Sequence, residues 1–169
     1  MSRPLRAIAA LAITGLLLAG CSTPPNTAAV VNGQRITETE VGDAWLALEP
    51  AVADGVGPTI VVESLVQNAL LAPVAADFGM SASAEDIASF ADSVYEGAPP
   101  DPFPAGLTNV LGFILLADQV NSSPLSAEIQ EAYLLALQDA EIEVNPRFGT
   151  INEMAQLDAP SFEWLTSEQ

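Results

Sequence analysis

The sequence predicts an all-α domain, a bundle of about five helices with a minor two-stranded β element that joins the N- and C-terminal ends of the domain. Three observations predict this fold. Apolar residues recur at helical spacing in five segments, which Pro-, Gly- and Ser-rich stretches separate. Short β-prone runs occur near both ends of the domain, at 29–31 and 141–144. Half of the residues are apolar, which is enough to bury one core.

A short strand and a tight turn are expected before the first helix. Residues 29–31 form a β-prone run that ends at Asn32-Gly33, a dipeptide that readily takes the positive φ angles of a turn. Thr37 and Glu40 have the spacing of a capping box, in which each side chain accepts a hydrogen bond from the other residue's amide. The first helix is expected to start there and to end at Glu49-Pro50, since a residue before proline disfavours the α conformation.

Four further helices and a closing strand are expected after it. The second helix is apolar nearly all round, which predicts a position at the centre of the bundle. Residues 141–144 alternate polar and apolar side chains, as in a half-exposed strand, and their natural partner is the run at 29–31. Neither strand would be stable alone. The four helices are expected at about 58–78, 83–96, 105–120 and 125–140.

The first twenty residues have the layout of a secretion signal. Arg3 and Arg6 give a cationic start, and residues 7–18 form an apolar run. This run is too short to cross a bilayer stably, since a spanning helix needs about 20 residues, and no stop-transfer pattern follows it. We expect residues 1–20 to be removed.

Residues 18–21 (LAGC) resemble the lipobox of bacterial lipoproteins. The resemblance implies cleavage between Gly20 and Cys21 and transfer of a diacylglyceryl lipid, with palmitate-type acyl chains, to the Cys21 thiol. Two or three acyl chains hold a protein on a membrane far more firmly than one. We therefore expect a lipid-anchored protein on the extracytoplasmic face of a cell membrane, or on the periplasmic face of an outer membrane. The alternative is an ordinary secretory signal followed by an incidental thiol.

Composition divides the chain into four parts. The segment after the signal is rich in Ser, Thr, Pro and Asn and has no periodicity, as in an extended tether. Residues from 153 onward contain Phe162, Trp164 and Leu165 without a convincing period. The expected parts are a lipoprotein signal peptide at 1–20, a flexible tether at 21–28, a helical domain at 29–150 and a partly disordered tail at 151–169.

The charge balance excludes nucleic acid as a partner. The chain carries 22 acidic residues and four basic ones, a net charge of −18. Loss of Arg3 and Arg6 with the signal would leave Arg35 and Arg147 as the basic side chains. Nucleic acids and anionic headgroups demand a basic surface, so membrane contact is expected through the lipid anchor alone.

The residue inventory argues against an enzyme. The chain has no His and no Lys, and its one Cys is expected to carry lipid. Most nucleophiles, general bases and zinc ligands are therefore missing, and no cofactor or metal is expected. The acidic residues at 86, 92, 96 and 101 lack the spacing of an EF-hand and fit a solvated face. An enzyme using paired carboxylates stays open as a distant alternative.

Three segments have an order and content that point to a known family: residues 29–37 (AVVNGQRIT), 65–71 (LVQNALL) with 75–80 (AADFGM), and 144–149 (VNPRFG). Together they resemble the N-terminal domain of the periplasmic chaperone SurA, which is related to the helical part of PrsA-type foldase lipoproteins. The resemblance covers most of 29–150. It implies a helical domain closed by a C-terminal strand, and binding of unfolded or exported polypeptides in an apolar groove between helices.

The chain has no room for the prolyl-isomerase (parvulin) module that full-length relatives carry, so the resemblance does not imply isomerase activity. We expect a non-enzymatic chaperone or holdase-like lipoprotein, which buries apolar segments of its clients against the second, fourth and fifth helices. The alternative is an adaptor or structural lipoprotein that binds one specific envelope protein.

Arg35 and Arg147 are candidates for binding a carboxylate. If the two strands pair, both arginines are expected near the same end of the small sheet, and guanidinium groups match carboxylates in bidentate fashion. The functional interpretation is a clamp for a carboxylate or a peptide terminus. The structural alternative, which we favour, is ion pairing with two of the many acidic neighbours.

Aromatic side chains are candidates for lining a peptide groove. Trp45, Phe90, Phe113 and Tyr133 could serve, because aromatic side chains give large contact areas at low entropic cost. The alternative, which we favour, is packing in the core.

Overall fold

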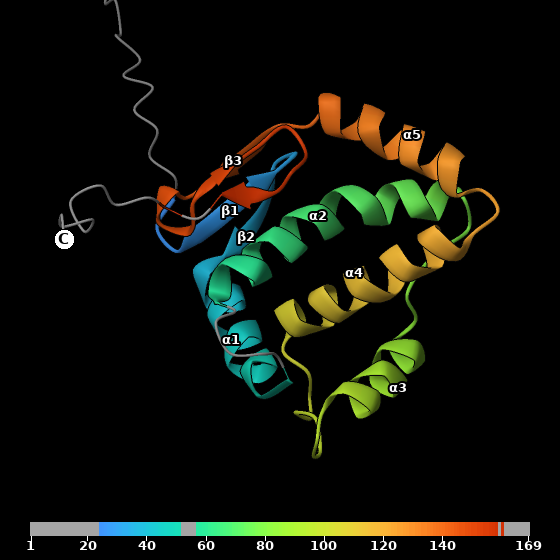
Figure 1. The fold of residues 1–169 in the computed structure, drawn as a ribbon. Coiled ribbons are helices and arrows are strands. Elements are labelled where there is room, and N and C mark those ends of the chain that lie inside the picture. The colour runs from blue at the N-terminus through green and yellow to red at the C-terminus, as the bar shows by residue number, and fades with distance from the viewer. Residues whose placement is uncertain (1–23, 52–56, 159, 161–169) are drawn as a thin grey trace, which may run out of the picture.

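The computed structural model describes residues 24–51, 57–158 and 160, which form a mainly helical fold with a small amount of antiparallel β structure (Figure 1). This confirms the predicted class of mainly helical with a minor β element. The helices are α1 (Glu38–Leu48), α2 (Pro58–Asp77), α3 (Ala84–Val94), α4 (Ala105–Ser122) and α5 (Ser126–Gln138), with 3₁₀ turns at Glu49–Ala51 and Pro146–Phe148. The strands are β1 (Thr27–Val31), β2 (Gln34–Thr37), β3 (Ile142–Val144), β4 (Thr150–Ile151) and β5 (Leu157–Asp158).

β1 lies in the middle of a three-stranded antiparallel sheet of order β2-β1-β3. The expected pairing of N- and C-terminal strands is present, with Ala29 opposite Val144. This sheet has three strands where two were expected, because the chain continues from the Asn32-Gly33 turn into β2. Gly33 has a φ of +80°, as the turn requires. The polar residues of β2 gave no strand signal in the sequence.

Side-chain caps start α1 and α3. The Thr37 hydroxyl accepts the Glu40 amide at 3.0 Å, as predicted. The reciprocal half of that capping box does not form, because Thr37 also ends β2 and the Glu40 carboxylate accepts a hydrogen bond from Asn109 of α4 at 3.4 Å. Ser83 and Asp86 form a complete capping box at the start of α3.

α2 lies at the centre of the fold, as its apolar sequence predicts. Figure 1 shows α5, α2, α4 and α3 following one another across the molecule, with α1 and the sheet at one end. α2 contacts α1, α4, α5 and β1. By length and composition alone α2 would also suit a membrane span, but half of the apolar window is buried inside the fold. Its position in the core accounts for its apolar character.

The core has two adjoining apolar clusters. The larger lies where the sheet, α1, α2 and α4 meet, and includes Leu65 and Leu107. The smaller lies between α2, α4 and α5, and includes Leu116 and Ile129. The smaller cluster forms the base of the candidate site described below.

The folded part continues past residue 150, where the sequence analysis places the end of the domain. β4 pairs antiparallel with β5, and the Asn152 side chain accepts the amides of Met154 and Gln156 at 2.9 and 3.1 Å in the turn between them. Strands of two residues are too short to give a periodic signal. Residues 161–169 lie outside the described residues, so the expectation for that part of the tail is untested.

Candidate functional site

An open groove of about 350 Å³ lies between α2, α4 and α5. This volume is at the lower end of the range of about 300–1,000 Å³ for ligand pockets. We call it the apolar groove, and its lining residues are Gln67, Leu71, Phe113, Ala117, Val120, Asn121, Ile129, Gln130, Tyr133, Leu134, Leu137, Met154 and Gln156.

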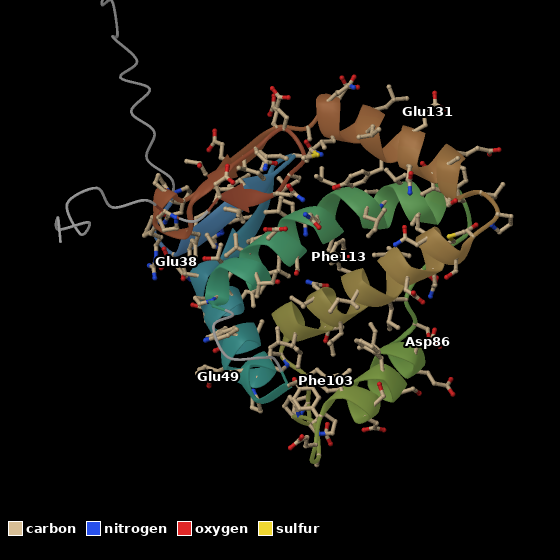
Figure 2. The ribbon with its side chains drawn as sticks, viewed as in Figure 1. Glu38, Glu49, Asp86, Phe103, Phe113 and Glu131 are labelled. Atoms are coloured by element: carbon tan, nitrogen blue, oxygen red, sulfur yellow. The ribbon has the colours of Figure 1, made fainter. Side chains whose placement is uncertain are left out.

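Helical spacing brings the apolar lining together. Ile129, Tyr133 and Leu137 repeat every four residues on α5 and therefore share one face of that helix. Figure 2 shows Phe113 between α2 and α4. Ile129 is fully buried at the base of the groove, whereas Leu134 is 54% exposed. The groove thus combines a packed floor with apolar side chains that solvent still reaches.

The turn between β4 and β5 contributes Met154, which is 63% exposed, to the lining of the groove. Two hydrogen bonds hold this turn against α2. Gln67 Nε2 donates to the carbonyl of Ala155 at 3.3 Å, and the Leu157 amide donates to Glu63 Oε2 at 3.1 Å. The β4–β5 turn is therefore attached to α2 by two polar contacts, one of which comes from the lining residue Gln67.

The lining carries no charged side chain among the described residues, although the chain has 22 acidic residues. Its polar groups are the amides of Gln67, Asn121, Gln130 and Gln156 and the phenol of Tyr133. Burial raises the pKa of Tyr133 above its usual value, so the phenol stays protonated at neutral pH and can donate a hydrogen bond. Amides both donate and accept, as a peptide backbone does. The arrangement suits noncovalent binding of an apolar chain.

Two of the aromatic candidates meet in this groove and two do not. Phe113 and Tyr133 both line it. Trp45 and Phe90 pack instead against the larger core cluster. For Trp45 the structure therefore favours the packing alternative, because α1 lies at the other end of α2 from the groove.

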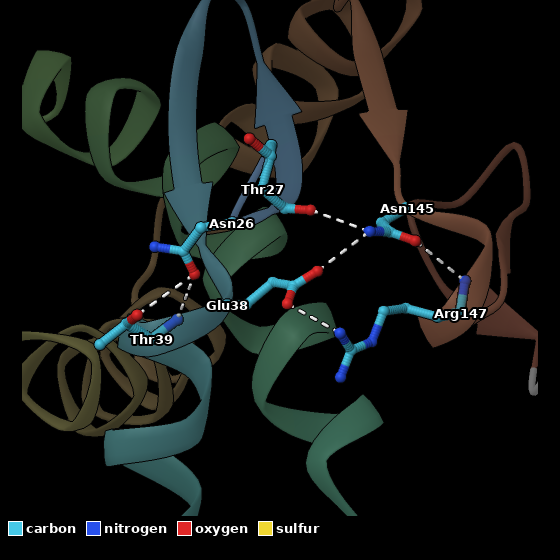
Figure 3. Close-up of polar contacts among 6 residues, drawn as sticks. All are labelled: Asn26, Thr27, Glu38, Thr39, Asn145 and Arg147. Carbon is cyan, nitrogen blue, oxygen red and sulfur yellow. Dashed lines mark hydrogen bonds and ion pairs between the residues drawn. The ribbon is translucent and has the colours of Figure 1, made fainter. Parts of the chain in front are cut away.

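Arg147 belongs to a polar network at the end of the sheet (Figure 3). Arg147 Nη1 donates to Glu38 Oε2 at 2.7 Å, and the guanidinium carbon lies 4.9 Å from the centre of the Phe148 ring. Asn145 Nδ2 donates to the other Glu38 oxygen at 3.2 Å and to the Thr27 carbonyl at 3.1 Å. We call Thr27, Glu38, Asn145 and Arg147 the strand-end network. The carboxylate that Arg147 binds is an internal one.

Arg35 lies elsewhere on the sheet. It is opposite Val30, three residues along β1 from Thr27, which corresponds to about 10 Å in a strand. Among the described residues Arg35 forms no ion pair. The expectation that Arg35 and Arg147 share one end of the sheet is therefore wrong, because the β1–β2 register separates them, and they form no joint clamp.

The remaining candidate positions lie outside the described residues or give no site. Gly20 and Cys21, the expected cleavage and lipidation residues, precede the first described residue. Within the described ranges, no three side chains of Asp, Glu, His or Cys gather into a possible metal site.

Some groove residues were not named by the sequence analysis. Met154 and Gln156 belong to the segment expected as a tail, and Gln67 and Gln130 are amides that a sequence pattern assigns to solvated faces. For Leu134, the sequence of α5 contains a weak signal of a role other than core packing. Leu134 falls outside the apolar stripe of that helix, as an extra leucine that core packing does not require.

Comparisons with known proteins do not identify a family for this chain. No protein-family model matches it, and neither a curated protein nor a solved structure is significantly similar to it.

Proposed function

We propose that this chain is a membrane-anchored extracytoplasmic lipoprotein, a chaperone or holdase-like protein that binds apolar segments of unfolded or exported polypeptides in the apolar groove. The observation that carries the proposal is an open and uncharged groove on a chain of net charge −18. The groove lies among α2, α4 and α5, the helices that the sequence analysis names for client binding. Binding there needs neither cofactor nor covalent chemistry.

Two properties of the groove favour a flexible segment over a folded partner. The groove is small and concave, with room for a few apolar side chains, whereas a stable interface between folded proteins buries about 1,600 Å². Its amides can exchange hydrogen bonds with the backbone of an unfolded segment. Each aliphatic side chain of the bound segment that is fully buried contributes about 1.5–3 kcal/mol to the free energy of binding. Burial of a few such side chains therefore gives reversible binding.

The proposal has two further parts, which are the lipid anchor on Cys21 and the relationship to the N-terminal domain of SurA. We infer that lipid on Cys21 holds the domain at a membrane, where exported chains emerge. We also infer that the domain is related to the N-terminal domain of SurA and lacks the parvulin module. Pairing of β1 with β3, which closes the helical domain with a C-terminal strand, supports that kinship.

Two adjacent leucines on α5 provide a matched test of the groove. Leu134 and Leu135 are 54% and 57% exposed, but only Leu134 lines the groove. In the full chain, Leu134→Gln should weaken binding of an apolar peptide about tenfold, the equivalent of about 1.4 kcal/mol, and should reduce suppression of aggregation of two unrelated unfolded proteins. Leu135→Gln should change neither measurement.

Equal losses in the two variants would show that general stickiness of α5, not the groove, explains the activity. One stoichiometric partner recovered by crosslinking in cells, together with no suppression of aggregation, would replace the chaperone proposal with the adaptor alternative.

Fractionation of cells tests the anchor. Cys21→Ser should move the protein from the membrane to the soluble fraction, because the acyl chains have no other attachment point in our proposal. Ser22→Ala is the matched control and should remain at the membrane. Membrane retention of Cys21→Ser would contradict lipid anchoring.

A further inference from the structure

Acidic residues adjoin the lining of the groove, although none of them belongs to the lining. Three exposed acidic residues are next in sequence to lining residues, one each on α4, α5 and the β4–β5 turn: Asp118, Glu131 and Glu153. Glu153 also lines a second hollow beside the groove, together with Leu134 and Leu137. Figure 2 shows Glu131 on the solvent side of α5. We call Asp118, Glu131 and Glu153 the acidic rim.

No positive charge of the described residues offsets the acidic rim. Their two basic side chains are Arg35 on β2 and Arg147 after β3, and Arg147 is already paired with Glu38. Because consecutive Cα atoms are 3.8 Å apart, each rim carboxylate lies within roughly 10 Å of a lining residue, which is about the Debye length at 0.1 M salt. A ligand therefore meets an apolar floor inside a field of negative charge.

We propose that the preferred occupants of the apolar groove are polypeptide segments with an apolar centre flanked by Lys or Arg. This inference rests on the proposed function and adds a rule of selection to it. The apolar centre is buried against α2, α4 and α5, and the basic flanks lie beside the acidic rim. Exposed charge pairs are individually weak, so the rim acts mainly by speeding association and by rejecting acidic segments and fatty acids.

Three fluorescent peptides test the rule. They share one apolar centre and carry Lys, Ser or Glu flanks, and they are titrated against the full chain in nanodiscs of zwitterionic lipid, with protein-free nanodiscs as the blank. In low salt the Lys-flanked peptide should bind roughly tenfold more tightly than the Ser-flanked one, and the Glu-flanked peptide should bind most weakly. In 1 M salt, where the Debye length is about 3 Å, the differences should largely disappear.

Two triple variants with the same change in net charge separate the acidic rim from the general charge of the chain. The rim variant should lose or reverse the preference for Lys flanks. The control variant carries its changes on and just after α3, which lies on the far side of α4 from the groove (Figure 1), and should keep most of the preference. The substitutions are Asp118→Lys, Glu131→Lys and Glu153→Lys in the rim variant, and Glu85→Lys, Asp92→Lys and Glu96→Lys in the control.

The outcomes distinguish this inference from the proposed function. Equal affinity for the three peptides, or an equal change of preference in both triple variants, would overturn selection by the rim and leave peptide binding in place. Binding of none of the peptides would remove the proposed function as well. A dimer in sedimentation equilibrium that Leu134→Gln dissociates and Leu135→Gln does not would assign the groove to a second copy, and would overturn the inference.

Discussion

The apolar groove and the strand-end network both contain residues that the sequence marks as binding candidates, yet only the groove is open to a ligand. In the network, Glu38 accepts from Arg147 and Asn145, so its carboxylate already has partners within the fold. In the groove, Leu134 and Met154 remain more than half exposed. Polar groups that satisfy one another stabilise a fold, whereas exposed apolar surface in a concave site is available for another chain.

The largest effect is expected from a substitution that should disrupt the β4–β5 side of the groove and leave the β2-β1-β3 sheet intact. Gly149 has a φ of +125°, and a Cβ there would overlap the Asp158 carbonyl oxygen of β5. Gly149→Ala should therefore destabilise the β4–β5 hairpin by about 3 kcal/mol. Hydrogen exchange should accelerate over 150–158 and peptide binding should weaken, while circular dichroism reports unchanged helix content.

Gly42→Ala is the control for that substitution. Gly42 lies inside α1 with open space around its Cα, so the added methyl group meets no atom within 4 Å and improves helix propensity. This variant should be as stable as the wild type or more so. Slow exchange over 150–158 in Gly149→Ala would show that the hairpin does not depend on the glycine.

A smaller effect is expected from the strand-end network, and on stability alone. Glu38→Gln removes the negative charge of the carboxylate that accepts hydrogen bonds from Arg147 and Asn145. This substitution should lower the free energy of unfolding by about 1–2 kcal/mol, measured by urea denaturation. Peptide binding should not change. Glu49→Gln, an exposed position at the other end of α1, is the control and should be neutral. Weakened binding in Glu38→Gln would mean that the two regions are coupled.

One polar group of the network is expected to cost stability. Thr27 Oγ1 is buried and has no hydrogen-bond partner among the described residues, whereas the Thr27 carbonyl accepts from Asn145. Thr27→Val removes the unsatisfied hydroxyl and keeps the shape, so it should stabilise the protein by about 1 kcal/mol. Calorimetry should show a melting temperature a few degrees higher, and a decrease would indicate that the hydroxyl is satisfied in solution.

The smallest expected effect is a dependence on alkaline pH. Burial raises the pKa values of Tyr133 in the groove and of Tyr95, whose hydroxyl donates to the Ala47 carbonyl at 2.7 Å. The unfolded chain then ionises first, so the stabilisation is complete below about pH 10 and is lost as pH rises through the folded pKa values. Urea midpoints should fall above pH 10, and less steeply in Tyr133→Phe. A flat profile would contradict the assignment.

The sequence predicts the parts of this fold that depend on periodicity and local caps. The five helices, the central position of α2, the Thr37 cap and the pairing of the run at 29–31 with the run at 141–144 all follow from such patterns. Phe113 and Tyr133 are among the aromatic candidates that the sequence offers for a groove, although it favours core packing for them, and both line the groove.

What the sequence does not predict depends on long-range contacts. The groove wall is attached by a hydrogen bond from Gln67 to Ala155, which are 88 residues apart. The separation of Arg35 from Arg147 depends on strand register, which two neighbouring β-prone runs do not specify. Both features arise from how distant segments meet, so no local pattern reports them.

β1 lies between β2 and β3 in the sheet. When the chain emerges N-terminus first, these two strands become available to pair with β1 at very different times. β2 follows it at once, but β3 comes after all five helices, and Asn145 bonds to a residue 118 positions earlier. Pairing across so long a loop is slow compared with the formation of local helices. Until residues 142–144 have emerged, one edge of β1 has no partner strand, so the sheet is completed only after the sequences of all five helices have emerged.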